Sequence, residues 1–482
     1  MFLMQHEQHT RRAFLRRSGQ MALMGAAAPL GLNLAAMGEA AAFTANDYKA
    51  LVCVFLFGGN DYANTVVTYD AARHQAYERI RMAGAGTAAG SIAIARARLE
   101  ATRLQPTVPL AGGAEYALHP SMGGLAGLFN AGQAAVQLNV GPLVTPTTRQ
   151  QYAGNTVPLP PKLFSHNDQQ SVWQSQGAEG STRGWGGNIG DLALSSNGNA
   201  LFTCISVTGN TVFLAGRNAM QYQCSTAGPV AIKATRGAQP FFYEPAMRAA
   251  FTEHIQQTRS HMLENEYNAV MRRGIAAEGQ VSGALGGVAL NTPFPANNPL
   301  AAQLRMVARL IGARNALGLK RQVFMASLGG FDLHDDMVGR QPAQLAQVSE
   351  AITAFYRATV ELGIADKVTT FTASDFGRTL TSNGDGTDHG WGSHHLVVGG
   401  GVRGKAFYGT PPPVSVGDTG APQDQWHIGQ GRLLPSTSVD QFGATLGKWF
   451  GVSATELPAI LPNIGHFGGG AYPVDVGFMA AA

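Results

Sequence analysis

Acidic and imidazole side chains gather in the glycine-rich segment from Thr372 to Lys405. The groups that could do chemistry are two carboxylates and three imidazoles: Asp375, Asp388, His389, His394 and His395. These are the side chains that bind divalent metal ions in proteins. Asn383-Gly384 and Asp385-Gly386 are also common turn residues, so this segment alone fits an ordinary surface turn equally well.

Two other parts of the chain place an aspartate in a similar position. Residues 50–57, 322–328 and 368–371 are apolar runs typical of buried parallel strands. Each run leads into an aspartate: Asp61, Asp332 and Asp375. The carboxyl ends of parallel strands border one crevice, so we expect these carboxylates to lie close together.

Histidines in the neighbouring loops would complete a metal site. His334 follows Asp332 by two residues, and His389 lies in the loop after Asp375. His166 stands in the segment LFSHNDQQ. Carboxylates placed side by side repel unless a cation or a proton lies between them. The sequence therefore predicts a divalent metal ion at this edge of the sheet.

The order of the predicted elements indicates an α/β fold with a mostly parallel sheet. Strands are expected at 50–57, 134–140, 322–328 and 368–371, and helices at 123–131, 300–317, 344–362 and 438–450. Residues 195–240 carry short strand patterns and are expected to form a small antiparallel excursion. A long amphipathic helix is expected at about 244–276. Residues 195–298 as a whole are a candidate cap or insertion.

The first residues predict export. The pair Arg11-Arg12 precedes a weakly apolar run at 21–37 and small residues suited to cleavage near Ala42. This order is typical of a twin-arginine signal peptide, here residues 1–42. The apolar run is short and rich in glycine and alanine for a membrane span, which needs about 20 apolar residues. We therefore expect a periplasmic or exported protein, carried by the twin-arginine translocation machinery, with no stable membrane span after cleavage.

Residues 43–482 are expected to form a single domain. Loss of the signal peptide lowers the formal net charge from +4 to about +2. No run of lysine and arginine follows, so nucleic acid is not an expected partner.

Cys53 is expected to be a buried thiol. Cys204 and Cys224 either pair in an oxidising compartment or stay reduced.

Two residues are candidates for direct roles in catalysis. Ser165 precedes a predicted helix, with Asp168 placed like the acid of a capping box. It is either the helix N-cap or a nucleophile close to backbone N–H groups that can hold an anion, and Thr65 is the alternative hydroxyl. Arg378, or Arg183 in its place, either stabilises charge on a reacting group or forms an ion pair with a carboxylate.

Several motifs together resemble a known bacterial family. The chain is similar, over nearly all of its mature length, to the domain-of-unknown-function (DUF) 1501 family in the segments FLFGGND, LFSHNDQQSVWQS, GWGG, GGFDLHDD, SDFGRT and GTDHGWGSHH. That family is similar in turn to the alkaline phosphatase and sulfatase superfamily, whose members transfer phosphoryl or sulfuryl groups with a pair of metals. The resemblance implies a doubly wound, mostly parallel sheet of the alkaline-phosphatase-like type.

The same resemblance implies roles for individual residues. Ser165 falls where the nucleophile follows the first strand. The positions that match metal ligands are four residues at strand ends and one histidine further on: Asp61, Asp332, His334, Asp375 and His389. Arg378 would stabilise charge on the transferred group.

The chain departs from the superfamily pattern at the second metal. Phe376 stands where a histidine ligand is expected, and Asp332 and His334 are closer together than the usual pair. One metal or two, and zinc or another ion such as manganese, magnesium or calcium, therefore fit the sequence. A substituting ligand such as His394 or His166 fits as well.

Two interpretations of function follow. The first is an exported metal-dependent hydrolase of phosphate or sulfate esters, acting on a small-molecule ester. The alternative is a catalytically silent envelope assembly or ligand-binding protein that keeps the same fold. Phe376, in the place of a ligand, is the feature that favours the alternative.

Overall fold

A ten-stranded sheet forms the centre of the protein in a computed structural model, which describes residues 45–82, 91–236 and 243–480. The expected signal peptide lies outside these residues. The strands of the sheet are β1 (Lys49–Leu56), β4 (Ala134–Gly141), β5 (Cys204–Ser206), β6 (Gln221–Ser225), β7 (Gly228–Pro229), β8 (Arg321–Leu328), β9 (Val368–Ser374), β10 (Ser393–Val398), β11 (Ala406–Tyr408) and β12 (Thr437–Ser438). Their order is β11-β4-β10-β9-β1-β8-β5-β6-β7, with β12 paired to β4.

The sheet is mostly parallel. β1 pairs in parallel with both β8 and β9, while β10 runs antiparallel to β9 and to β4. At the far edge β6 and β7 are also antiparallel. The excursion expected at 195–240 thus contributes β5 and β6 to the main sheet in parallel, and only its last strand pair is antiparallel. A separate antiparallel pair is formed by β2 (Val66–Thr68) and β3 (Tyr116–Leu118).

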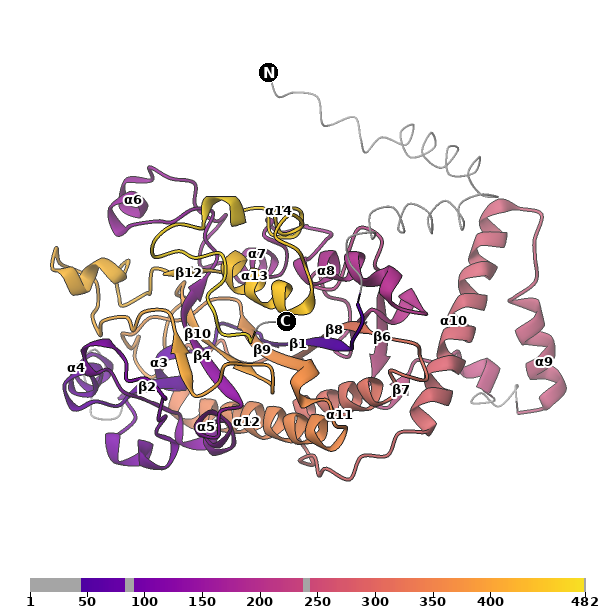
Figure 1. Cartoon of the computed structure of the whole chain (residues 1–482), viewed down its shortest axis with the longest axis horizontal. Helices are drawn as coiled ribbons and strands as arrows, with labels where there is room; N and C mark the ends of the chain where they lie inside the picture. Colours follow the sequence, from indigo (N-terminus) through magenta and orange to yellow (C-terminus); the bar gives the residue numbers. More distant parts are fainter. Residues whose placement is uncertain (1–44, 83–90, 237–242, 481–482) are drawn as a thin grey trace, which may run out of the picture.

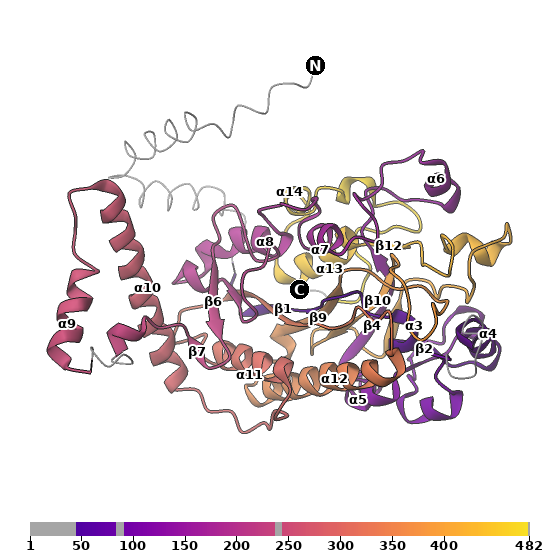
Figure 2. The same cartoon turned by 180° about the vertical axis from the view of Figure 1, so that it is seen from behind.

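Helices cover both faces of the sheet (Figures 1 and 2). One face carries α5 (Gly123–Asn130), α11 (Pro299–Gly312) and α12 (Met337–Glu361), and the other carries α7 (His166–Ser175), α8 (Trp185–Ala193), α13 (Val439–Phe450) and α14 (Leu457–Ile460). Successive side chains of a strand point to opposite faces. Val52 and Val54 of β1 accordingly pack in one core, and Cys53 and Phe55 in the other. The protein is a mixed α/β fold in three layers.

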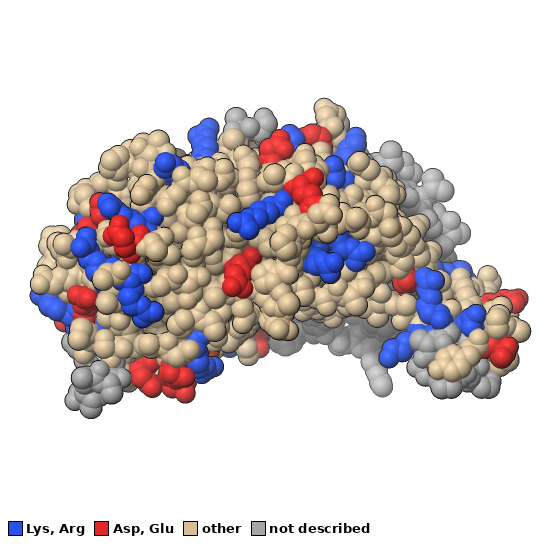
Figure 3. Space-filling view, turned by 90° about the horizontal axis from the view of Figure 1, so that it is seen from below, with Lys and Arg blue, Asp and Glu red and all other residues tan. Residues whose placement is uncertain are grey.

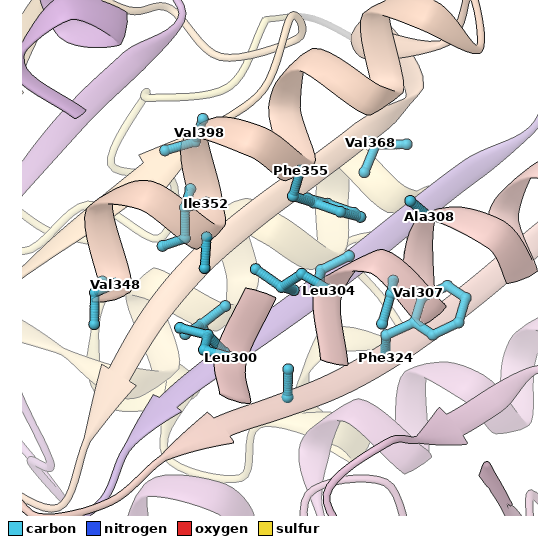
Figure 4. Packing of buried hydrophobic residues seen from close by; sticks show 14 of the residues in the cluster. Leu300, Leu304, Val307, Ala308, Phe324, Val348, Ile352, Phe355, Val368 and Val398 are labelled. Atoms are coloured by element: carbon cyan, nitrogen blue, oxygen red, sulfur yellow. The ribbon is translucent and has the colours of Figure 1, made fainter. Parts of the chain in front are cut away.

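The core beneath α11 and α12 shows why these segments are helical. Leu300, Leu304 and Val307 follow the helical repeat on α11 and pack against Ile352 and Phe355 of α12, above the sheet (Figure 4). Each large apolar side chain buried in this way contributes roughly 1.5–3 kcal/mol. The two helices therefore hold one face of β1, β8 and β9 in place.

The long helix expected at about 244–276 is two helices. They are α9 (Pro245–His254) and α10 (Met262–Gly286). The chain turns between them because side chains of α10 satisfy the backbone of the turn: Asn268 donates to the Gln257 carbonyl over 2.7 Å, and Asn265 accepts from the Arg259 N–H over 3.2 Å. The pair projects beyond the sheet (Figures 1 and 2).

The three cysteines are buried and form no disulfide. Cys204 packs in the same core as Cys53, and Cys224 packs in the core on the opposite face. Burial raises the pKa of the Cys224 thiol to about 12, which keeps it protonated. Among the described helices, none is both long and apolar enough to cross a membrane.

The start of α13 allows a test of local stability. Ser438 Oγ accepts from the Gln441 N–H over 3.0 Å, and Gln441 Oε1 accepts from the Ser438 N–H over 2.9 Å, which is a complete capping box on a buried helix. We expect Ser438→Ala to lower the free energy of unfolding by about 0.5–2 kcal/mol in urea denaturation. Thr148→Ala is the matched control, because Thr148 caps α6 (Arg149–Gly154), a helix without buried residues that can open locally. We expect Thr148→Ala to lower the free energy of unfolding by less than Ser438→Ala does. Equal losses in the two variants would contradict the view that burial of α13 makes its capping box contribute to global stability.

Candidate metal centre

Three loops meet at the carboxyl ends of β9, β1 and β8, which are neighbours in the sheet. Gly58 lies in the loop after β1 with φ +114°, and a Cβ added there would stand 2.3 Å from the backbone nitrogen of Asp332. Only glycine permits both the conformation and the contact. This close approach brings the loop after β1 against the loop after β8.

Three imidazoles and one carboxylate converge where these loops meet. His389 Nε2 lies 3.1 Å from His166 Nε2 and 2.9 Å from His334 Nε2. Asp332 completes the group, with Oδ1 3.0 Å from His334 Nε2 and Oδ2 3.3 Å from His166 Nε2. Ligand atoms of His166, Asp332 and His389 all lie within 4.8 Å of one another.

The opposite nitrogen of each imidazole contacts an oxygen. His166 Nδ1 lies 2.7 Å from Asp375 Oδ2, His389 Nδ1 lies 2.7 Å from the Phe164 carbonyl, and His334 Nδ1 lies 3.3 Å from Asp388 Oδ1. An Nδ1–H that donates to such an acceptor leaves the Nε2 lone pair free to bind a metal. Metal-binding histidines usually have this arrangement.

The separations fit a single metal ion. Four ligands placed tetrahedrally at about 2.0–2.1 Å from zinc are roughly 3.3 Å from one another. The measured Nε2 and carboxylate separations run from 2.9 to 3.3 Å. His166, Asp332 and His389 thus form a donor set of a size that one cation can occupy, and His334 lies at its edge, with its Nε2 2.9 Å from His389 Nε2.

Arg378 sets the charge of the carboxylate. Its guanidinium is buried, donates to Asp332 Oδ1 over 3.0 Å and to the Gly58 carbonyl over 2.9 Å, and contacts Thr387 through both the hydroxyl and the carbonyl. Burial alone would raise the pKa of Asp332, but the hydrogen bond and charge of Arg378 lower it. Asp332 is therefore held as an anion, as a metal ligand must be.

The pKa values of His166 and His389 are shifted in opposite directions by their surroundings. The hydrogen bond to Asp375 raises the pKa of His166, while burial lowers the pKa of His389 and favours its neutral form. Beneath both rings lies Phe376, buried, with ring centroids 4.8 Å from His166 and 4.7 Å from His389. The side chains of Asp332 and His334 remain about two-fifths exposed, at 44% and 42%, so the group is open to solvent on one side.

Two of the predicted metal ligands lie outside this donor set. Asp61 caps α3 (Tyr62–Thr65) by accepting from the Asn64 N–H over 2.7 Å, and its other oxygen pairs with the buried Arg81 over 2.8 Å. Asp375 stands behind His166, with its second oxygen accepting from the Gly58 N–H over 3.2 Å. Both carboxylates are therefore fully engaged by protein donors, whereas Asp332, His334 and His389 come together as expected ligands would.

Ser165 is placed beside the centre and not within the donor set. It occupies the N-cap position of α7, directly before His166, but its side chain makes no capping bond. Its hydroxyl instead donates to Asp168 Oδ2 over 2.9 Å, and Lys162 pairs with the same oxygen over 3.5 Å. The hydroxyl thus has a carboxylate that can accept its proton.

His394 and His395, named as possible substituting ligands, belong to β10 and are buried in it. His394 Nδ1 accepts from the Asn139 backbone N–H over 3.0 Å. Burial lowers the pKa of each imidazole to about 3. The nitrogen that joins the centre comes instead from His166.

The first turn of α7 contributes two contacts to the site that the sequence analysis did not predict. His166 and Gln170 are four residues apart on this helix, and both contact Asp375 Oδ2, Gln170 Nε2 over 2.8 Å. That i, i+4 spacing was the available signal. No pattern pointed to Arg432, which donates to the His389 carbonyl over 2.6 Å and stacks its guanidinium over Phe164.

The family of the chain is defined by its sequence. Residues 48–461 match the family described as "Protein of unknown function (DUF1501)", and the chain belongs to this family. The resemblance drawn from the motifs is thereby confirmed at the level of the family. No curated protein sequence matches the chain.

Solved structures give only distant likenesses. Ps i-CgsB in complex with k-i-k-neocarrahexaose is 11% identical, with 87% of this chain and 77% of that chain covered and a TM-score of 0.35. The lipoteichoic acid synthase LtaP from Listeria monocytogenes is 10% identical, with 77% and 68% covered and a TM-score of 0.28. A protein of Bacteroides thetaiotaomicron glycosaminoglycan metabolism, BT33494S-sulf, is 10% identical, with 85% and 74% covered and a TM-score of 0.30.

The donor set can be tested by titrating metal-stripped protein with Zn²⁺ in a calorimeter. We expect Asp332→Asn to abolish tight binding and Asp375→Asn to weaken it about 10–100-fold, because loss of the carboxylate behind His166 lowers its basicity and frees its ring. Affinity should rise with pH as His166 loses its proton, since proton and cation compete for Nε2 and Asp375 raises the pKa of His166.

Asp335→Asn is the matched control for this titration. Asp335 lies in the same loop as His334, its side chain is 74% exposed, and it forms an ion pair of 3.3 Å with Arg340. Its replacement should leave affinity unchanged. Equal weakening by Asp335→Asn and Asp375→Asn would show that loop charge, and not the buried contact to His166, governs binding.

Proposed function

We propose that this protein is an exported metal-dependent hydrolase of phosphate or sulfate esters, built on a doubly wound domain of the alkaline-phosphatase-like type. The observation that supports the proposal most is the convergence of three Nε2 atoms on Asp332, each imidazole held from behind by an oxygen. The resemblance of the strand-end motifs to the phosphatase and sulfatase superfamily supplies the reaction class.

The donor set indicates the kind of metal. Imidazole nitrogen suits zinc and other transition metals, whereas magnesium and calcium prefer oxygen ligands. A donor set in which imidazole nitrogens outnumber carboxylate oxygens therefore favours zinc over manganese, magnesium or calcium. When bound, such an ion acts as a Lewis acid on a phosphoryl or sulfuryl oxygen.

Side chains around the centre would orient the carboxylate ligand, attract the ester and attack it. Arg378, with its donors occupied by Asp332, Gly58 and Thr387, orients and ionises the carboxylate ligand. Arg432 adds positive charge beside His389, which favours an anionic ester at the open side of the group. We propose Ser165 as the nucleophile: its Oγ bonds to phosphorus or sulfur as the ester oxygen leaves, and its proton passes to Asp168.

Compartment and partners belong to the same proposal. The arginine pair Arg11-Arg12 and the cleavable run behind it support export to the periplasm by the twin-arginine machinery. A small-molecule ester is the proposed substrate, and residues 43–482 offer no lysine and arginine run for nucleic acid.

Turnover of aryl phosphate and aryl sulfate esters tests the reaction class. We expect the zinc-loaded protein to release the phenol from at least one of the two, a chelator to stop the reaction, and added Zn²⁺ to restore it. Asp332→Asn should be inactive and Asp335→Asn should match the unaltered protein. Tight zinc binding without turnover of either ester would favour the silent ligand-binding interpretation that Phe376 suggested.

Ser165→Ala tests the nucleophile separately. If Ser165 attacks the ester, kcat should fall about a thousandfold or more while zinc affinity stays unchanged, because the hydroxyl is not a ligand. A rapid burst of phenol equal to the enzyme concentration would accompany a covalent intermediate in the unaltered protein. Activity of Ser165→Ala within a few-fold of the unaltered protein would leave Ser165 only the role of starting α7, with water as the attacking group.

A further inference from the structure

The helices α9 and α10 form an arm that stands away from the body (Figures 1 and 2). We define the arm as α9, the turn at 255–261 and the first half of α10 up to Gly274. α9 has no buried side chain, and four of the five buried residues of α10 lie beyond Gly274. Val281 and Leu285 anchor the second half of α10 in the core. The first half thus extends from a fixed base.

The arm exposes apolar side chains in a regular stripe. Leu263 is 69% exposed, Tyr267 62% and Val270 50%. Their spacing of four and then three residues places them on one face of α10. Half of the twelve large hydrophobic residues exposed in the described part of the chain lie between Tyr243 and Val270. Such a concentration on a projecting helix indicates a surface that another molecule covers.

Charges beside the stripe identify the kind of molecule. Glu266 and Arg273 flank it on one edge and form an ion pair of 2.8 Å, with both side chains more than three-fifths exposed. A second copy of this helix, running antiparallel, would place its Arg273 opposite Glu266 and its Glu266 opposite Arg273. An exposed pair contributes only about 0–1 kcal/mol, so exchanging partners costs little.

The overall charge of the arm supports the same partner. Residues 244–273 hold four glutamates and four arginines, and no lysine or aspartate. Figure 3 shows residues of both signs at this end of the molecule. A neutral surface with both signs suits its own copy better than an anionic membrane or a strongly charged protein.

The shape of the arm allows close packing of two helices. A hollow of about 510 Å³ lies beside the stripe, lined by Arg259, His261, Leu263, Glu264, Tyr267 and Asn268. A Cβ added to Gly274 would meet nothing within 4 Å, so a second helix can approach closely there. We propose that the arm is a dimerisation element, in which the stripe of α10 packs antiparallel against the stripe of a second copy about a two-fold axis.

Sedimentation of the mature full-length protein tests this proposal independently of any activity. We expect a dimer, and we expect Val270→Lys to raise its dissociation constant at least about tenfold by placing two cations near the axis. Val360→Lys is the matched control, because Val360 is 53% exposed on α12, outside the arm, and should leave the dimer intact. Circular dichroism and thermal melting of both variants check that they fold alike.

Charge reversal tests the antiparallel arrangement. Glu266→Arg and Arg273→Glu should each weaken association, since each places like charges together across the axis. An equimolar mixture of the two variants should dimerise again, because all pairs are then opposite in sign. A monomeric unaltered protein, a dimer that Val270→Lys does not weaken, or no recovery in the mixture would overturn the proposal. Binding of a monomeric protein through the arm to vesicles containing phosphatidylserine would overturn it in favour of a membrane surface.

Discussion

The buried carboxylate of Asp375 is the group on which the arrangement of the candidate metal centre depends. It accepts hydrogen bonds from His166 and Gln170 of α7 and from the backbone of Gly58, groups that lie more than 200 residues away in the chain. Its side chain is fully buried, so without these donors its charge would cost several kcal/mol. The contact therefore holds α7 against two strand ends and presents His166 Nε2 to Asp332.

Close packing beside this carboxylate explains why an aromatic residue follows Asp375. Gly59 has φ +80°, and a Cβ added there would lie 2.4 Å from the ring of Phe376. That ring in turn supports His166 and His389. Phe376 is therefore part of the floor beneath the candidate donor set and supplies no ligand atom itself.

The four longest strands of the sheet, β1, β4, β8 and β9, could be predicted closely because their sequences allow few alternatives. The run 50–57 is apolar on both faces and became β1, shifted by one residue, since only a central parallel strand buries both faces at once. The helix expected at 244–276 could not be divided in advance. Its turn depends on hydrogen bonds from Asn265 and Asn268 to backbone groups in the turn, and polar residues of this kind are equally common on exposed helices.

The sequence by itself determined the family, the α/β class and the part of the chain where acidic and imidazole groups gather, because motifs and hydrophobic periodicity are local properties. Only the tertiary structure decided which of these groups share one site. Asp61, Asp332 and Asp375 all follow strands, yet each has a different partner. Asp61 pairs with Arg81, Asp332 contacts the imidazoles of His334 and His389, and Asp375 contacts His166. The partner of a side chain depends on which loops meet, and that is settled by packing between distant segments and not by neighbours along the chain.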